Sequence, residues 1–170
     1  KPRFQKVLEK VMRESKWGRI LPKGHGLGIA IHKTRGSIVG AVIEVFMDTS
    51  GILTLNKVWI AIDCGKVINP DTVRAQMEGG FTFGLSAALG EEITLKDGRV
   101  EQSNFHDYPI LRLKGSPIIS VEMIESGNEI GGVGEVAVPI AAPALANAIF
   151  SSSGRRIRSL PLIKHGIKIA

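Results

Sequence analysis

The first third of the chain changes from a helical repeat of apolar positions to strand-like runs. Apolar residues recur every three or four positions from Phe4 to Met12 with charged residues between them. This spacing predicts an amphipathic helix of about three turns. After a break at "LPKGHGLG", residues 27–35 and 38–48 are rich in β-branched residues and predict two strands. The turn "DTSG" then predicts that the second strand forms a hairpin with "ILTLNKVWIAID".

The middle of the chain predicts a long helix with a well-defined start. Asn69 can cap it, Pro70 suits its first turn, and Asp71 favours the positive end of its dipole. Apolar residues then follow at helical spacing as far as Ala88. The helix also contains Gly79, Gly80 and Gly84. Because each glycine costs a helix up to about 1 kcal/mol relative to alanine, we expect close packing against another backbone at this point.

The last part of the chain mixes strand and helix signals without a regular βαβ order. "EITLKDGRVEQ" predicts a hairpin around an Asp97–Gly98 turn, and "SPIISVEMIES" predicts a further strand. A helix is expected from about Ala142 to Ser153, with Gly154 as its stop. No internal repeat or low-complexity linker divides the sequence. We therefore expect residues 1–170 to form a single α+β domain with a mixed sheet and packed helices.

Charge and hydropathy narrow the classes of protein. The chain has 22 basic and 16 acidic residues, a net charge of +6, and the basic residues lie mainly near its two ends. No aromatic residues interleave with the C-terminal basic group, so we do not expect nucleic-acid binding. A phosphate-bearing cofactor, an acidic protein partner or a solvated surface would each account for the charge. The longest apolar run, residues 136–150, contains two prolines and is too short to span a bilayer.

The start of the chain carries no recognisable targeting segment. No secretory signal is visible, and the first residue is Lys1 rather than methionine. We therefore expect a processed product or a piece of a longer protein. The sequence does not indicate whether its compartment is the cytoplasm or the periplasm.

Several familiar kinds of site are excluded by residue type and spacing. Cys64 is the single cysteine, which rules out a disulfide framework, and its context "AIDCGK" predicts a small buried thiol rather than a nucleophile. The four histidines are scattered and no two have metal-ligand spacing, so no metal ligand is predicted. His106 lies in a polar stretch, "NFHDYP", that predicts a loop with internal hydrogen bonds. "GHGLGIA" lacks the spacing of the dinucleotide fingerprint, and "GGVGEV" lacks the Walker lysine.

One carboxylate stands out because of its neighbours. Glu135, in "EIGGVGEVAVPI", lies between glycines and an apolar run, and no basic residue occurs from Gly131 to Phe150. If desolvation raises its pKa toward the working pH, such a group can act as a general base and contribute ~10²–10⁴-fold to a rate. The alternative is a surface glutamate at a turn. Gln76, just before "EGG", is a second candidate because its amide both donates and accepts, the alternative being an exposed helix glutamine.

Three ordered blocks of the chain resemble one enzyme family. They are "DCGKVINPDTVRAQMEGGFTFGLSAAL", "DGRVEQSNFHDYPILR" and "GGVGEVAVPIAAPALANAIFSSSGRRIRSLPL". The blocks resemble the C-terminal part of the molybdenum-hydroxylase large subunit, in the xanthine dehydrogenase and aldehyde oxidoreductase superfamily. The likeness is greatest to its isoquinoline 1-oxidoreductase beta-subunit type, a bacterial type.

The resemblance implies a fold, a cofactor and roles for named residues. It implies an oxidoreductase that hydroxylates an N-heterocycle or oxidises an aldehyde, with water as the oxygen source, at a molybdenum–molybdopterin cytosine dinucleotide. By motif, Glu135 is the base that takes a proton from a water-derived ligand of the metal. Val133 and Gly134 form the wall beside it. Gln76, Gly79 and Gly80 contact the pterin.

The family's catalytic subunit is several-fold longer than this chain. The resemblance therefore implies that residues 1–170 are the C-terminal portion of a molybdopterin-binding subunit and are inactive alone. The implied partners are the remainder of that subunit, a small subunit with [2Fe–2S] clusters and a small-molecule substrate. Two other functions stay open: a non-catalytic assembly module, and an unrelated anion-binding domain that uses the glycine turns with Arg155, Arg156 and Arg158.

Overall fold

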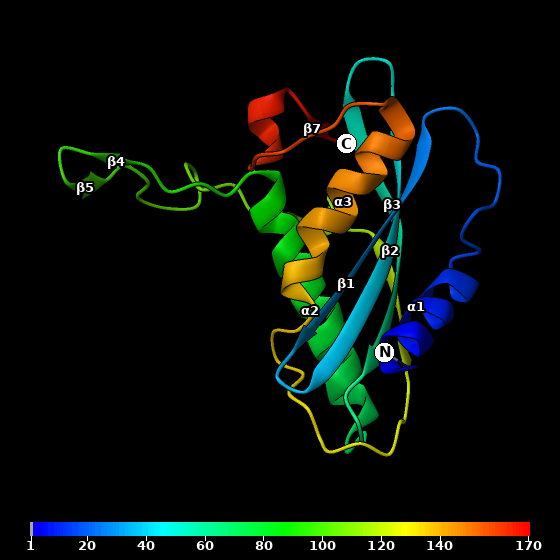
Figure 1. Ribbon diagram of the computed structural model, residues 1–170. Coiled ribbons are helices and arrows are strands. Elements are labelled where there is room, and N and C mark those ends of the chain that lie inside the picture. Colours follow the sequence, from blue (N-terminus) through cyan, green and yellow to red (C-terminus); the bar gives the residue numbers. More distant parts are fainter. Residues whose placement is uncertain (1) are drawn as a thin grey trace.

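A mixed β-sheet lies at the centre of the computed structural model, which describes residues 2–170 (Figure 1). Its strand order is β1-β2-β3-β6, and β7 also pairs with β3. The strands are β1 (His25–Thr34), β2 (Ser37–Met47), β3 (Ile52–Asp63), β6 (Ile118–Met123) and β7 (Lys168–Ile169). The first three are antiparallel, whereas β6 and β7 run parallel to β3. The predicted hairpin and the predicted α+β class are both confirmed.

Helices cover both faces of the sheet. The helices α2 (Pro70–Leu89) and α3 (Val138–Ser153) pack on one face, and α1 (Pro2–Glu14) packs on the other (Figure 1). Alternate residues of β2 point to opposite faces: Val39 and Ala41 join the core beneath α2 and α3, whereas Val42 joins the core beneath α1. Burial on both faces explains why the β2 sequence is a nearly continuous apolar run.

Two glycines of β1 allow α3 to lie directly on the strand. A Cβ atom on Gly26 would lie 2.4 Å from the Ala148 carbonyl oxygen, and one on Gly28 would lie 2.1 Å from the Ala144 carbonyl oxygen. Any larger residue at either position would push the helix off the sheet. Gly26 and Gly28 of "GHGLG" therefore belong to the strand, which begins at His25, two residues before the predicted start.

The glycines of α2 serve the contact between the two long helices. A Cβ on Gly84 would lie 2.5 Å from the Val138 carbonyl oxygen, and one on Gly80 would lie 3.4 Å from the Ala137 Cβ. The predicted close packing is confirmed for these two glycines. Gly79 is different, because a Cβ there would meet no described atom within 4 Å. At the start of the helix, the Asn69 side chain accepts a hydrogen bond from the Thr72 amide at 3.1 Å, as predicted.

Helix α3 begins at Val138, four residues before the predicted start. Pro139 occupies the first turn, where the missing N–H of proline has no helical partner to lose. Pro143 lies inside the helix on its exposed side. The helix tolerates it because nearby residues of the same helix, Ala141 and Ala144, are buried against the core.

A long arm, residues 90–112, projects from the end of α2 (Figure 1). It carries the predicted hairpin, but its strands β4 (Leu95–Lys96) and β5 (Arg99–Val100) have only two residues each. Short 3₁₀ turns follow at η1 (Leu113–Gly115) and η2 (Leu162–His165). Within residues 2–170, no helix combines the length and the hydropathy needed to cross a membrane.

Candidate functional site

Glu135 lies at the end of the glycine loop, residues 124–135, just before α3. Its side chain is exposed, and its carboxylate has no hydrogen-bond or ion-pair partner among residues 2–170. Its backbone is fixed, however, because the Val138 amide donates to the Glu135 carbonyl oxygen at 3.1 Å. The next residue, Val136, is 1% exposed and points into the core. The chain thus holds the backbone of Glu135 in place and directs its carboxylate outward.

The glycine loop is bonded to the end of the sheet at several points. The Gly131 amide donates to the Cys64 carbonyl oxygen at 2.9 Å, and the Gly132 amide donates to that of Arg35 at 2.8 Å. The Ser37 hydroxyl donates to the Gly132 carbonyl oxygen at 2.7 Å. These two amides are therefore engaged by the protein itself and are not free to bind an anion.

Gly134 has no structural explanation within the described residues. A Cβ at this position would meet no atom within 4 Å, and its φ lies outside the left-handed region that favours glycine. Gly79 on α2 shares this property, since it lies inside a helix and also faces open space. The absence of a side chain at both positions is consistent with the close approach of something outside this segment.

The contact between α2 and α3 brings the middle of α2, which carries other predicted residues, next to the segment that contains Glu135. Gly80 packs against Ala137, which follows Glu135 by two positions. Gln76 lies one helical turn before Gly80 and is exposed. Gln76, Gly79, Gly134 and Glu135 are all exposed, and they lie on the two segments that meet at this contact. Gly80 is half-buried and faces α3.

A small cavity of about 160 Å³ separates the glycine loop from the first turns of α2. Val133, which is half-buried, lines this cavity together with residues from both elements. They are Cys64, Lys66, Ile68, Asn69, Thr72, Val73, Ile130 and Gly131. The cavity is much smaller than the ~300–1,000 Å³ of a ligand pocket, so it does not form a binding pocket by itself.

Two further sequence predictions concern side chains away from this surface. Cys64 is 2% exposed, and burial raises the pKa of its thiol, which suppresses the reactive thiolate. The predicted buried thiol is confirmed. His106 lies in a loop where Asp107 accepts hydrogen bonds from the Asn104 and Ser103 amides, which lower the pKa of Asp107 to about 2. The predicted hydrogen-bonded loop is also confirmed.

Two of the three C-terminal arginines, Arg155 and Arg156, already have protein partners. Arg155 donates to the His165 carbonyl oxygen at 2.7 Å, and Arg156 donates to the Asn147 side chain at 3.0 Å. The Arg156 guanidinium also lies 3.5 Å from the centre of the Phe150 ring. These contacts weigh against the anion-binding alternative. Across the described part of the chain, no group of three or more His, Cys, Asp or Glu side chains is arranged to hold a metal ion.

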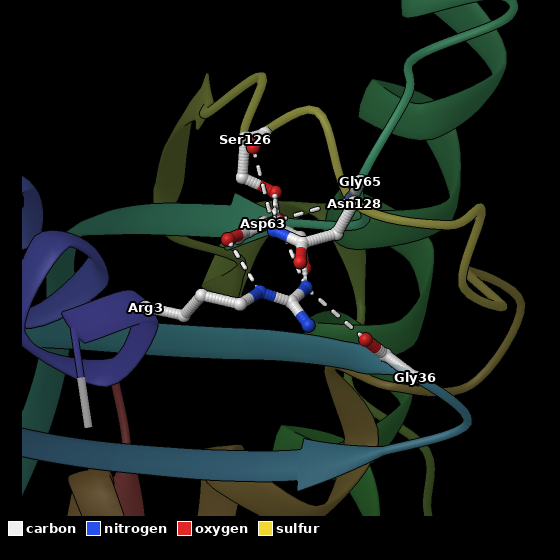
Figure 2. Close-up of polar contacts among 6 residues, drawn as sticks. All are labelled: Arg3, Gly36, Asp63, Gly65, Ser126 and Asn128. Atoms are coloured by element: carbon white, nitrogen blue, oxygen red, sulfur yellow. Dashed lines mark hydrogen bonds and ion pairs between the residues drawn. The ribbon is translucent and has the colours of Figure 1, made fainter.

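One polar network was not predicted from the sequence. Asp63, at the end of β3, is fully buried and pairs with Arg3 of α1 (Figure 2). The two residues are 60 positions apart, so no local motif connects them. The available signal was a charged residue at the end of a long apolar strand, "VWIAID", since a buried acid requires a partner.

Comparison with known proteins identifies the family. The family model of the molybdopterin cofactor-binding domain matches residues 23–117, which is more than half of the chain. The beta subunit of isoquinoline 1-oxidoreductase from Brevundimonas diminuta is 39% identical over 165 residues, which cover 95% of this chain and 21% of that protein. The membrane-bound aldehyde dehydrogenase [pyrroloquinoline-quinone] from Gluconacetobacter polyoxogenes is 34% identical over 164 residues, covering 92% of this chain and 21% of that protein.

The fold is shared with a solved enzyme structure. Quinoline 2-oxidoreductase from Pseudomonas putida 86 superposes with a TM-score of 0.67 and 25% identity, over 74% of this chain and 17% of that one. The chain thus spans about a fifth of the length of the curated relatives it matches. The resemblance seen in the sequence is confirmed, and the protein belongs to the molybdopterin cofactor-binding domain family, as a segment of the large subunit of the molybdenum hydroxylases.

Proposed function

We propose that this chain is the C-terminal portion of a molybdopterin-binding subunit and that it supplies the general base of the reaction, Glu135. The observation that carries the proposal is an unpaired, exposed carboxylate on a backbone that is bonded to the sheet on one side and to a helix on the other. An exposed glutamate needs no partner because water solvates it, so the fixed backbone rather than the missing partner distinguishes Glu135. An acid kept free at a fixed position is suited to accept a proton from a group that approaches from outside.

The residues around Glu135 fit a pterin cofactor bound over them. Gln76 offers an exposed amide that can donate to and accept from a ring with mixed edges. Gly79 and Gly134 leave room for close approach, and neither conformation nor packing within the described segment requires glycine there. Val133 and Gly134 would form the wall beside the metal. For Gly80, the contact with α3 accounts for the missing side chain, and its contact with the pterin remains a prediction.

The bound molybdenum–pterin group would supply the redox chemistry, by accepting an electron pair from the substrate carbon. The role of this chain is to hold the Glu135 carboxylate where it can take up a proton from a water-derived oxygen. The names of the relatives support an N-heterocycle or an aldehyde as the substrate class. We further propose the cytosine dinucleotide form of the pterin and a partner subunit with [2Fe–2S] clusters, as the resemblance implies.

The remainder of the subunit has to complete the site. A general base works best when its pKa lies near the working pH, and exclusion of water is the usual means of raising a carboxyl pKa. Glu135 is exposed in residues 2–170, so the surface that covers it must come from elsewhere in the assembled enzyme. We therefore expect the isolated chain to be inactive.

Substitution of Glu135 in the assembled enzyme tests the proposal. Glu135→Gln should leave the molybdenum content unchanged and lower kcat by at least about 100-fold, the lower end of the general-base range. Glu129→Gln is the matched control, since Glu129 is also exposed and lies in the same loop. Equal turnover of both variants and the wild type would refute the base assignment and favour an assembly module.

A further inference from the structure

The buried carboxylate of Asp63 accepts hydrogen bonds from three different parts of the chain (Figure 2). Arg3 of α1 donates from Nε to Oδ2 at 2.8 Å and from Nη2 to Oδ1 at 2.9 Å. The Ser126 hydroxyl donates to Oδ1 at 2.7 Å, and the Gly65 amide donates to the same oxygen at 3.0 Å. One side chain thus connects the N-terminal helix, the end of β3 and the glycine loop.

The network is fully satisfied, which allows a charge to be buried there. Burial acts to raise the pKa of Asp63, but hydrogen bonds from Arg3, Ser126 and Gly65 outweigh it, so the pKa lies below its ordinary value. Bidentate pairing with arginine also fixes the orientation of the carboxylate plane. Asp63 therefore offers Ser126 an acceptor that is charged and immobile.

The network is continuous with the loop that ends at Glu135. Ser126 accepts a hydrogen bond from the Asn128 side chain at 2.7 Å. The following backbone crosses directly over Gly65, where a Cβ would lie 2.1 Å from the Glu129 carbonyl oxygen. The amides of Gly131 and Gly132 then bond to the sheet end, as described above. The last of these attachments lies three residues before Glu135.

Arg3 also supports the other side of the loop. Its Nη2 atom donates to the Gly36 carbonyl oxygen at 3.1 Å. Gly36 precedes Ser37, whose hydroxyl donates a hydrogen bond to the Gly132 carbonyl oxygen. The Arg3–Asp63 pair therefore contacts the end of β3 and the turn between β1 and β2, and the glycine loop is bonded to both of these segments. Position matters to a base, because a displacement of about 1 Å can cost ~10²-fold in rate.

We propose that Asp63, acting through Ser126, is a positioning residue for Glu135. This inference rests on the proposed function of Glu135. The network fixes the first half of the glycine loop, so that the carboxylate at its end stays within reach of the group that it deprotonates. The role is distinct from general stability because the bond from Ser126 to Asp63 holds the loop and no other element.

The test uses Ser126→Ala in the assembled enzyme, which removes the link to the loop and leaves the Arg3–Asp63 pair intact. A hydrogen bond to a charged group contributes enough that hydrogen exchange of the Gly131 and Gly132 amides, which are bonded to the sheet end, should quicken by about 10–100-fold. We expect kcat to fall by about 10–100-fold with KM and molybdenum content unchanged. Ser126→Thr keeps the hydroxyl and should restore both exchange and kcat.

Lys10→Met is the control for loss of an ordinary ion pair. Lys10 bonds to Glu122 at 2.7 Å and joins α1 to β6 without contacting the glycine loop. The Lys10→Met variant should change neither the hydrogen exchange of the glycine-loop amides nor kcat. Faster exchange in Ser126→Ala with normal kcat would overturn the positioning role, and so would a parallel loss of molybdenum and activity. If Glu135→Gln abolishes turnover while Ser126→Ala does not, the inference fails and the proposed function stands.

Discussion

Alanine substitution separates two kinds of glycine in α2. A Cβ on Gly84 would lie 2.5 Å from the Val138 carbonyl oxygen, a backbone atom that cannot rotate away. A Cβ on Gly79 would have no described atom within 4 Å. Both residues lie inside the same helix, so the intrinsic helix preference for alanine is the same at the two positions. The two variants therefore differ in what the added methyl group meets.

The expected changes in stability have opposite signs. Alanine stabilises a helix interior by about 0.8–1.0 kcal/mol relative to glycine, and Gly79→Ala should gain this amount in full. At Gly84 the same gain is opposed by overpacking, which costs about 1–3 kcal/mol and disturbs the contact with α3. The free energies of unfolding of the two variants should therefore differ by roughly 1–3 kcal/mol, with Gly79→Ala the more stable.

Two measurements on each variant complete the experiment. Urea unfolding of the 170-residue chain, followed by circular dichroism, gives the stability, and metal analysis of the assembled enzyme gives the molybdenum content. Gly79→Ala should yield a more stable chain but an enzyme with less molybdenum, because the methyl group occupies the surface that the cofactor approaches. Normal molybdenum content in a stabilised Gly79→Ala enzyme would refute the assignment of Gly79. Equal stability of Gly79→Ala and Gly84→Ala would refute the close helix contact.

Two further predictions concern Asp63 and the arm. The folded pKa of Asp63 is lowered, so its contribution to stability is present above the unfolded pKa of about 3.9 and is lost as the pH falls through the folded pKa. Asp63→Asn should therefore cost about 3 kcal/mol at pH 7 in urea unfolding, a difference that shrinks in acid, and a constant difference down to pH 2 would contradict this reasoning. In the arm, Leu95 and Phe105 are 71% and 66% exposed, and trypsin should cleave the free chain after Lys96 or Arg99 but spare the assembled enzyme. Equal cleavage of both would show that the arm is not an assembly surface.

Local periodicity and turn chemistry were sufficient to predict most of the fold. The Asn69 cap, the hairpin of β2 with β3 and the apolar spacing of α2 each depend on neighbouring residues, and each is confirmed. The start of α3 was wrong by four residues because two prolines near it allow more than one first turn. The glycines of β1 were assigned to a break because their partner, α3, lies more than 100 residues away.

The candidate site could be located from the sequence only through its motifs. Glu135 and Gln76 were identified by type and by resemblance, and the structure adds that both are exposed. The Arg3–Asp63–Ser126 network could not be predicted, because it joins residues 60 or more positions apart that share no pattern. A contact of this kind depends on the sheet register and on where α1 packs, which local spacing does not determine.

The exposure of Glu135 indicates how the proposed activity would be divided between this segment and the remainder of the enzyme. A base needs a fixed position and a dry environment, and these are separate physical requirements. This chain meets the first, since the glycine loop is bonded to the sheet and continues directly into α3. We infer that the second is met on assembly, when another surface covers the carboxylate.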